Sequence, residues 1–311
     1  MTQTARIMLD DRWSWIAPLL ACPSCRGPFE SADGPPDASG LRCAACATAY
    51  ASRPGGSTLD LRCKTPRRHT MTMTTGALDP AGSLAAIPHA PPDLPPAGVL
   101  PDRAAPHILP LLRQRVPPQS IVVEIGGGSG AYRDVFRGTE YRFVTTDYGY
   151  EAADILADAH ALPFRDDVAS AVVMQSVIQS LENPFAGMSE AARILRKDGL
   201  LLGTADCGAV FAGSYFNPTP WGTIALLASA GLAIERMWVT KDVLSFAGTN
   251  PGYPAAIKLL LRLLSRIARW RVWTPRLLLA GRRRDEFVTA GSCAFVARKA
   301  TSPAATNGGG S

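Results

Sequence analysis

Residues 122–130 read Val-Val-Glu-Ile-Gly-Gly-Gly-Ser-Gly, an apolar run that ends in a glycine-rich turn. The run predicts a buried strand, and the turn predicts the point where the chain enters a helix. Glycines there remove side chains where a ligand would lie, and the first turn of a helix offers free N–H groups to an anionic group. We therefore expect Glu124, Gly126, Gly128 and Gly130 to line a nucleotide-type site.

A glycine-rich turn is a weak signal on its own, because plain loops and dinucleotide sites also use it. Further motifs follow it in order. Residues 142–147 form a β-branched run ending in Asp147, which predicts a second strand whose carboxylate accepts the ribose hydroxyl groups of a cofactor. Residues 158–164 then read D-A-H-A-L-P-F, residues 171–174 predict a fourth strand and residues 200–204 a fifth. Residues 196–199, R-K-D-G, are expected to close the helix before that fifth strand.

This order of motifs resembles class I S-adenosylmethionine (SAM) methyltransferases over residues 103–299. The resemblance implies an α/β fold with a Rossmann-like, seven-stranded sheet of order 3-2-1-4-5-7-6. It also implies that SAM is the cofactor and that Asp158 accepts a hydrogen bond from its adenine amino group. His160 is expected to line the cofactor site. The expected SAM-binding residues are Glu124, Gly126, Gly128, Gly130, Asp147, Asp158, Ala159 and Gln175.

Four of the seven cysteines have metal-ligand spacing. Cys22 and Cys25 form one C-x2-C pair and Cys43 and Cys46 another, which predicts a tetrahedral structural zinc site. A module of this size buries too little apolar surface to fold alone, so four thiolates on Zn2+ would supply the missing stability. The segment resembles the zinc-ribbon family that activates tRNA and rRNA methyltransferases as a separate subunit, here fused to the catalytic domain.

The composition predicts two modules joined by a linker. The chain has 311 residues, which is longer than one such domain needs. Its hydrophobic content of 47% is enough to form a core. No signal peptide and no membrane-spanning run are evident, so a cytoplasmic location, with peripheral membrane contact as one option, is expected. The expected divisions are a zinc ribbon over 1–62, a Pro/Gly-rich linker over 63–102, a SAM-dependent methyltransferase domain over 103–300 and a disordered tail over 301–311.

Residues 251–285 are expected to be a basic insertion within that domain. Residues 255–271 have the periodicity of an amphipathic helix, with apolar side chains on one face and cations on the other. Such a helix is typical of a membrane-surface element, here over 255–284, and also of a lid that packs its apolar face on the catalytic domain. The lid is the favoured interpretation, and both favour a substrate with a hydrophobic part. The cations are Lys258, Arg262, Arg266 and Arg269.

Candidate catalytic residues follow the fourth and fifth expected strands, where open α/β sheets place their substrates. These are Gln179 and Asp206, with Tyr215 further along the chain. A carboxylate such as Asp206 is a candidate base for a hydroxyl acceptor, but it reads equally well as a turn or cap residue.

The expected reaction is SAM-dependent methyl transfer to an oxygen atom of a small or lipid-like substrate. A net charge of +6 and a pI near 9.1 leave an rRNA or tRNA base methyltransferase as an alternative. Nucleic acid is less favoured, because basic and aromatic residues are not interleaved as single-stranded RNA binding prefers. A non-catalytic SAM-fold scaffold or activator is a further alternative, and the oligomeric state is not predicted.

Overall fold

The computed structural model describes residues 15–30, 40–51, 58–63, 108–207, 214–249, 253–276 and 290–299. Within residues 268–276 the description covers the backbone only. Residues 64–102 of the expected linker, the tail 301–311 and residues 277–285 of the insertion lie outside it.

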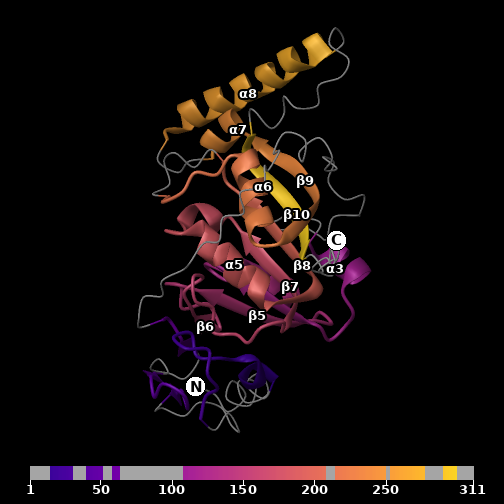
Figure 1. The fold of residues 1–311 in the computed structure, drawn as a ribbon. Helices are drawn as coiled ribbons and strands as arrows, with labels where there is room; N and C mark the ends of the chain where they lie inside the picture. The colour runs from indigo at the N-terminus through magenta and orange to yellow at the C-terminus, as the bar shows by residue number, and fades with distance from the viewer. Residues whose placement is uncertain are drawn as a thin grey trace, which may run out of the picture.

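A mixed sheet of eight strands forms the centre of the molecule, in the order β3-β6-β5-β4-β7-β8-β10-β9 (Figure 1). The strands from β3 to β8 are parallel, and β10 is antiparallel to both β8 and β9. The expectation of seven strands is wrong by one, because β3 from the N-terminal module adds to the edge at β6. The strands of this sheet are β3 (Leu59–Asp60), β4 (Ile121–Ile125), β5 (Arg142–Asp147), β6 (Ile155–Leu156), β7 (Ala169–Gln175), β8 (Leu195–Ala205), β9 (Leu232–Asp242) and β10 (Ala290–Lys299).

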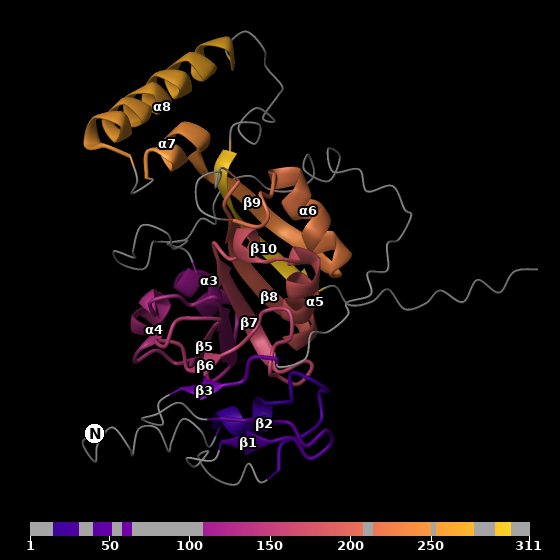
Figure 2. The same cartoon turned by 90° about the vertical axis from the view of Figure 1, so that its left-hand side faces the viewer.

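Helices cover both faces of the sheet, as buried parallel strands require. Figure 2 shows α3 and α4 on one side of the strands and α5 and α6 on the other. The side chains of β4 alternate between the two layers: Val122 packs with the α3 and α4 side, and Val123 packs with the α5 and α6 side. Both valines are fully buried. The helices are α3 (Ile108–Arg115), α4 (Ala131–Phe136), α5 (Pro184–Ile194), α6 (Pro220–Ser229), α7 (Val243–Ala247) and α8 (Ala255–Arg276), with short 3-10 turns η1 (Ala17–Leu19) and η2 (Ile178–Ser180).

The helix before the fifth expected strand ends earlier than the sequence predicts. The side chain of Asn183 accepts a hydrogen bond from the N–H of Ala186 and caps α5, which then ends at Ile194. Leu195 already pairs with Ala169 of β7, so residues 196–199 belong to β8 and do not close the helix. Strand pairing therefore overrides the local signal of the K-D-G turn.

The N-terminal module packs against the sheet edge as part of the same core. It contains a short hairpin of β1 (Leu41–Arg42) and β2 (Ala49–Tyr50), followed by β3. Ile16, Leu20 and Leu61 are almost fully buried in one apolar cluster with Ile155 and Phe164 of the catalytic domain. The module and the domain thus share one hydrophobic core.

At the other end of the sheet, α7 lies between α8 and the ends of β9 and β10 in both views (Figures 1 and 2). The helix predicted over 255–271 is present, but most of its large apolar side chains are exposed, among them Leu259 and Leu260. The expectation of a lid that packs this face on the catalytic domain is therefore wrong for the described residues. No helix in the described part of the chain is long and apolar enough to cross a membrane.

Candidate active site

A cleft of about 870 Å3 opens at the carboxyl ends of β4, β5 and β7. This is the edge where open α/β sheets bind their ligands, and the volume lies in the range of small-molecule sites. Seven of the eight predicted cofactor residues line it; Gly130 does not. The predicted residues in the lining are Glu124, Gly126, Gly128, Asp147, Asp158, Ala159 and Gln175.

The glycine turn leaves room for a ligand on one side and for buried polar groups on the other. Gly128 has a φ of +53°, and a Cβ there would meet no atom within 4 Å, so the turn is open toward the cleft. A Cβ at Gly127, which the motif did not single out, would collide with Thr145 and Glu124 behind the turn. Gly130 has a φ of +84° and precedes α4, so it shapes the exit from the turn.

Glu124 lies beneath this turn and is only 2% exposed. Burial raises the pKa of its carboxyl group to about 7. Its Oε2 atom, like Oγ1 of the neighbouring Thr145, has no hydrogen-bond partner among the described residues. A buried acceptor of this kind suits a ligand that brings a positive charge or a hydrogen-bond donor.

Asp147, at the end of β5, ties the glycine turn to the following loop. Its Oδ2 accepts a hydrogen bond from the N–H of Gly128 at 2.9 Å. Its Oδ1 accepts from the N–H groups of Gly149 at 2.9 Å and Tyr150 at 3.0 Å. A carboxylate has about four acceptor positions, which leaves capacity for a ligand hydroxyl group.

Asp158 is oriented by His160, and both line the cleft as predicted. The Oδ1 of Asp158 accepts from the N–H of His160 at 2.9 Å and lies 2.7 Å from its Nδ1. The Nε2 of His160 accepts from the N–H of Asn183 at 3.1 Å, so the network assigns the ring proton to Nδ1. The hydrogen bond with Asp158 raises the pKa of His160, whereas the Asn183 amide pairs only with the neutral ring.

The structure brings Gln179 and Asp206 together beside the cleft rather than in its lining. Gln179 Nε2 donates to Asp206 Oδ2 at 3.0 Å and to the main-chain oxygen of Ser176 at 2.6 Å. Ser176 and Tyr215 do line the cleft, and Tyr215 is 71% exposed. Ser176 was missed because a serine after a strand carries no distinctive signal in the sequence.

The hydrogen-bond acceptors and the open turn at the cleft fit SAM. SAM carries a positively charged sulfur, an ammonium group, two ribose hydroxyls and an adenine. Glu124 offers a buried, unsatisfied oxygen, Asp147 and Asp158 offer oriented carboxylates, and the open face at Gly128 accepts a close approach. The residues present therefore match the cofactor that the sequence motifs imply.

Residues 123–203 match the family model described as a methyltransferase domain. The chain carries a methyltransferase domain. The match spans the glycine turn, Asp147, Asp158 and Gln175, and the enzyme is a SAM-dependent methyltransferase. A search of the curated proteins finds no match to the chain.

Three solved structures are among those to which the chain is similar. A Bacillus halodurans protein described as a methyltransferase has 15% identity, covers 62% of this chain and 98% of its own, and gives a TM-score of 0.41. The complex of the Haloferax volcanii Trm112 methyltransferase activator with a methyltransferase matches at 16% identity, 63% and 90% coverage and a TM-score of 0.39. Phosphoethanolamine N-methyltransferase 2 of Haemonchus contortus, bound to SAM, has 13% identity and a TM-score of 0.37. The match covers 62% of this chain and 52% of that protein's chain.

The four predicted metal ligands of the N-terminal module converge. The sulfur atoms of Cys22, Cys25, Cys43 and Cys46 all lie within 4.8 Å of one another. Each pair sits on the same kind of turn: the N–H of Arg26 donates to the Cys22 oxygen, and the N–H after Cys46 donates to the Cys43 oxygen. Four thiol donors at this spacing fit a tetrahedral Zn2+ ion.

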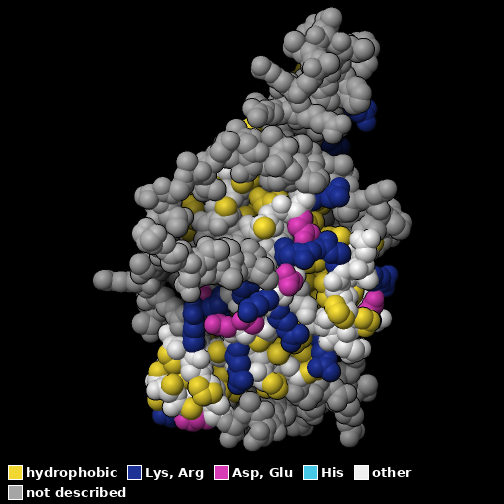
Figure 3. All heavy atoms as spheres, turned by 45° about the vertical axis from the view of Figure 1, so that its right-hand side comes forward, with side chains coloured by type: hydrophobic (Ala, Val, Ile, Leu, Met, Phe, Trp, Pro, Cys, Tyr) yellow, Lys and Arg dark blue, Asp and Glu magenta, His cyan; other side chains and the backbone are white. Residues whose placement is uncertain are grey.

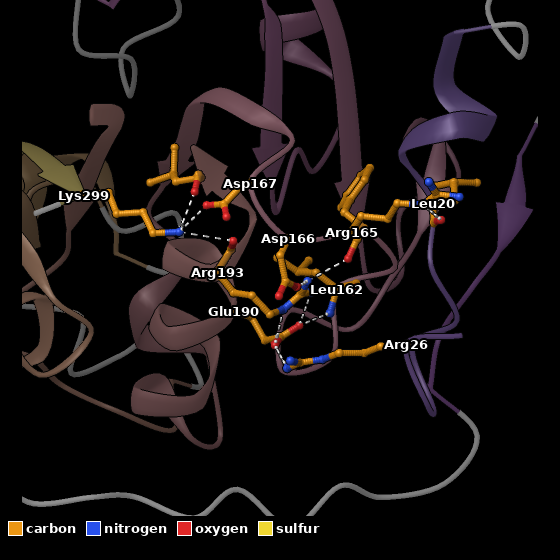
Figure 4. Close-up of polar contacts among 11 residues, drawn as sticks. Leu20, Arg26, Leu162, Arg165, Asp166, Asp167, Glu190, Arg193 and Lys299 are labelled. Carbon is orange, nitrogen blue, oxygen red and sulfur yellow. Dashed lines mark hydrogen bonds and ion pairs between the residues drawn. The ribbon is translucent and has the colours of Figure 1, made fainter. Parts of the chain in front are cut away.

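A cluster of charged residues anchors the Asp158–Phe164 loop of the methyltransferase domain to the N-terminal module (Figure 4). Glu190 of α5 accepts hydrogen bonds from the N–H of Leu162 at 2.9 Å and from Arg26 at 2.8 Å. Arg193 pairs with Glu190 at 2.7 Å and donates to the main-chain oxygens of Leu162 and Phe164. These positioning residues are scattered along the chain, so no local motif could have revealed them.

Proposed function

We propose that this methyltransferase transfers the methyl group of SAM to an oxygen atom of a small or lipid-like substrate. The observation that supports it is the lining of the cleft, which contains no Lys or Arg among the described residues. The lining instead contains neutral polar and apolar side chains near the carboxyl end of β7, including Ser176, Val177, Ser180 and Leu181. An uncharged acceptor with an apolar part suits these groups better than a polyanion does.

The residues of this chain would hold the cofactor and position the acceptor. When bound, SAM supplies a methyl group on a positively charged sulfur, so alignment and exclusion of water are the protein's main tasks. Asp147 would accept the ribose hydroxyls, Asp158 would face the adenine, and Glu124 would balance positive charge beneath the turn. Gln179 and Asp206 would act as positioning residues, because their hydrogen bonds hold the main chain at Ser176.

Transfer to an rRNA or tRNA base is the weaker candidate. Beyond the lack of cations in the described cleft lining, many basic side chains elsewhere are paired with acids. On the face drawn in Figure 3, Lys and Arg side chains (dark blue) lie among Asp and Glu side chains (magenta). In the described structure Arg298 pairs with Glu235 at 2.6 Å and Lys299 with Asp167 at 2.7 Å. On this face the mixed charge does not form the continuous cationic surface that phosphates favour.

We also propose that the cysteine cluster binds one structural Zn2+ ion, on the basis of its donor set and spacing. The contacts of Arg26 with Glu190 and of Leu20 with the Pro163–Phe164 segment indicate that the ribbon supports the cofactor site. The ribbon would thereby play within one chain the role of an activating subunit.

The test combines SAM titration with a transfer assay. Calorimetric titration of the full chain should show SAM binding that falls roughly tenfold to hundredfold in Asp147→Ala, since charge-assisted hydrogen bonds are lost. Asp134→Ala is the matched control, because Asp134 is 74% exposed on the nearby α4 and should leave affinity unchanged.

Acceptors would then be screened with methyl-labelled SAM, using pools of hydroxylated small molecules and lipids alongside total RNA. Label in an O-methyl product supports the proposal, and label only in RNA supports the alternative. SAM binding without label in any acceptor would instead support a scaffold that retains its cofactor.

A further inference from the structure

The long helix α8 presents its apolar side to the outside of the molecule. Six of its large apolar side chains are between 41% exposed, at Leu264, and 60% exposed, at Leu259. Monomeric soluble proteins rarely leave so many neighbouring apolar side chains in water, and such patches usually mark an interaction site. Among the described side chains of the helix, the exposed large apolar ones are Ile257, Leu259, Leu260, Leu263, Leu264 and Ile267.

The opposite side of the helix makes the contact with the rest of the protein. Ser265 is fully buried, and its Oγ donates to Asp242 Oδ2 at 2.7 Å and lies 2.8 Å from Ser245 Oγ. Next to it, α8 approaches Gly248 closely, where a Cβ would meet Arg262 and the Lys258 oxygen at 3.4 Å. A helix that packs through a serine and the stems of cations leaves its apolar face unused. The orientation of α8 is therefore fixed with the apolar face outward.

The charge of α8 limits which partner fits this face. The helix contains six Lys and Arg residues and no Asp or Glu. On a helical projection Arg266 borders the apolar face beside Leu259, and Arg262 and Lys258 follow on that same side, toward the part of the helix that meets the protein. At 1.5 Å per residue the helix is about 33 Å long, which is long enough to lie along a surface over its whole length.

We infer that α8 docks this enzyme on an anionic lipid surface, with the apolar face inserted at the level of the headgroups and the cations against lipid phosphates. Apolar burial and attraction to negative lipids both favour this arrangement. A second copy of this chain would bring another wholly cationic helix to the same face, and like charges disfavour that contact. The inference does not depend on the identity of the methyl acceptor.

Vesicle flotation of the full chain tests it. Wild type should float with mixed phosphatidylcholine and phosphatidylserine vesicles and much less with phosphatidylcholine alone, and high salt should reduce binding. Leu260→Asp/Leu264→Asp should reduce the partition coefficient at least tenfold, whereas Leu260→Phe/Leu264→Phe should retain it. Arg262→Gln/Arg266→Gln should reduce binding to the anionic vesicles about thirtyfold, from about 1 kcal/mol per cation.

A matched control adds the same two charges elsewhere. Gln114→Asp/Ala228→Asp places them at exposed positions of α3 and α6 and should leave flotation unchanged. Equal flotation of Leu260→Asp/Leu264→Asp and wild type would overturn the inference, as would no flotation of wild type with any vesicle. Light scattering that shows a wild-type dimer and a monomer for the aspartate variant would assign the face to a second copy instead.

Discussion

The two attachments to the central sheet, the N-terminal module at the β6 edge and α8 beyond β9 and β10, are joined to it in opposite ways. The module contributes β3 to the sheet and buries Leu20 and Leu61 in the core of the domain. Helix α8 is held through Ser265 and the short α7, and it leaves its apolar side exposed. We propose that the first attachment supports the cofactor site and that the second is a surface for a partner outside the molecule.

The contrast shows that amphipathic character alone does not predict what a segment packs against. Both attachments carry apolar side chains and cations. In the module, Arg26 pairs with the buried Glu190 and thereby completes a cluster inside the protein. In α8 the cations accompany no acidic residue of their own helix. The contact between Arg26 and Glu190 therefore lies inside the protein, whereas the large apolar side chains of α8 lie on its outside.

The largest effect is expected from breaking the metal cluster. Cys22→Ser/Cys43→Ser should release one equivalent of zinc and unfold the N-terminal module, because structural zinc contributes about 10 kcal/mol or more to the folding of small modules. SAM affinity should fall as well, since the loop around Leu162 loses its support. Metal analysis, calorimetry and thermal unfolding measure these changes. Cys63→Ser is the control outside the cluster, and unchanged metal content in the double variant would contradict the site.

The next effect is expected from the charged contact between the N-terminal module and α5. Glu190 has a side chain 4% exposed between Arg26 and Arg193. Glu190→Gln leaves the buried Arg193 with only Asp166, whose side chain is 62% exposed, as a charge partner, and should cost about 3 kcal/mol in the free energy of unfolding. Arg26→Ala, at a side chain 46% exposed, should cost about 1 kcal/mol or less. Urea unfolding would give both values, and a cost near zero for both variants would show that the module is held by its apolar contacts alone.

Measuring stability over a range of pH tests the buried Glu124 of the cofactor site separately from both attachments. The folded-state pKa of Glu124 is raised to about 7, so its contribution to stability is complete below about pH 4.5 and is lost as the pH rises through 7. Without ligand, the free energy of unfolding of wild type should fall by up to about 3 kcal/mol between pH 5 and pH 8, relative to that of Glu124→Gln. SAM should reduce that difference, because a positive charge favours the ionised carboxylate. Urea unfolding at both pH values measures it, and parallel pH curves for the two proteins would refute the burial argument.

The smallest effects should come from α8. Ser265→Ala removes the hydrogen bond to Asp242 and should cost about 1 kcal/mol. Leu260→Asp, on the outward face, should change the free energy of unfolding by less than about 0.5 kcal/mol. A large loss of stability in Leu260→Asp would mean that this face is covered in solution and would remove the contrast between the two attachments.

The sequence predicted the parts of the fold that depend on local pattern. The strand at 121–125, the carboxylates at Asp147 and Asp158 and the four clustered cysteines could be identified because each is a short motif with a direct physical reason. The pairing of β3 with β6 and the contact of Arg26 with Glu190 join residues far apart in the chain, and no spacing rule reports them.

The orientation of α8 was beyond prediction for a different reason. Its pattern fixes two faces but not which of them meets the protein. The deciding contacts involve Ser265 and Asp242, two common polar residues whose pairing depends on the packing of α7. The lid was therefore favoured over the membrane-surface element on general grounds, and the structure shows most of the large apolar side chains of this helix exposed.

The pairing of β3 with β6 also bears on how the chain folds as it is made. Leu59 pairs with Ile155, so the strand that covers this edge of the sheet is synthesised well before the strand that it covers. Uncovered strand edges are where chains join one another wrongly, and covering them early limits aggregation during synthesis. A chain shortened at its N-terminus so that it lacks β3 and the segment around Leu20 is therefore expected to expose both the edge of β6 and the apolar surface around Phe164.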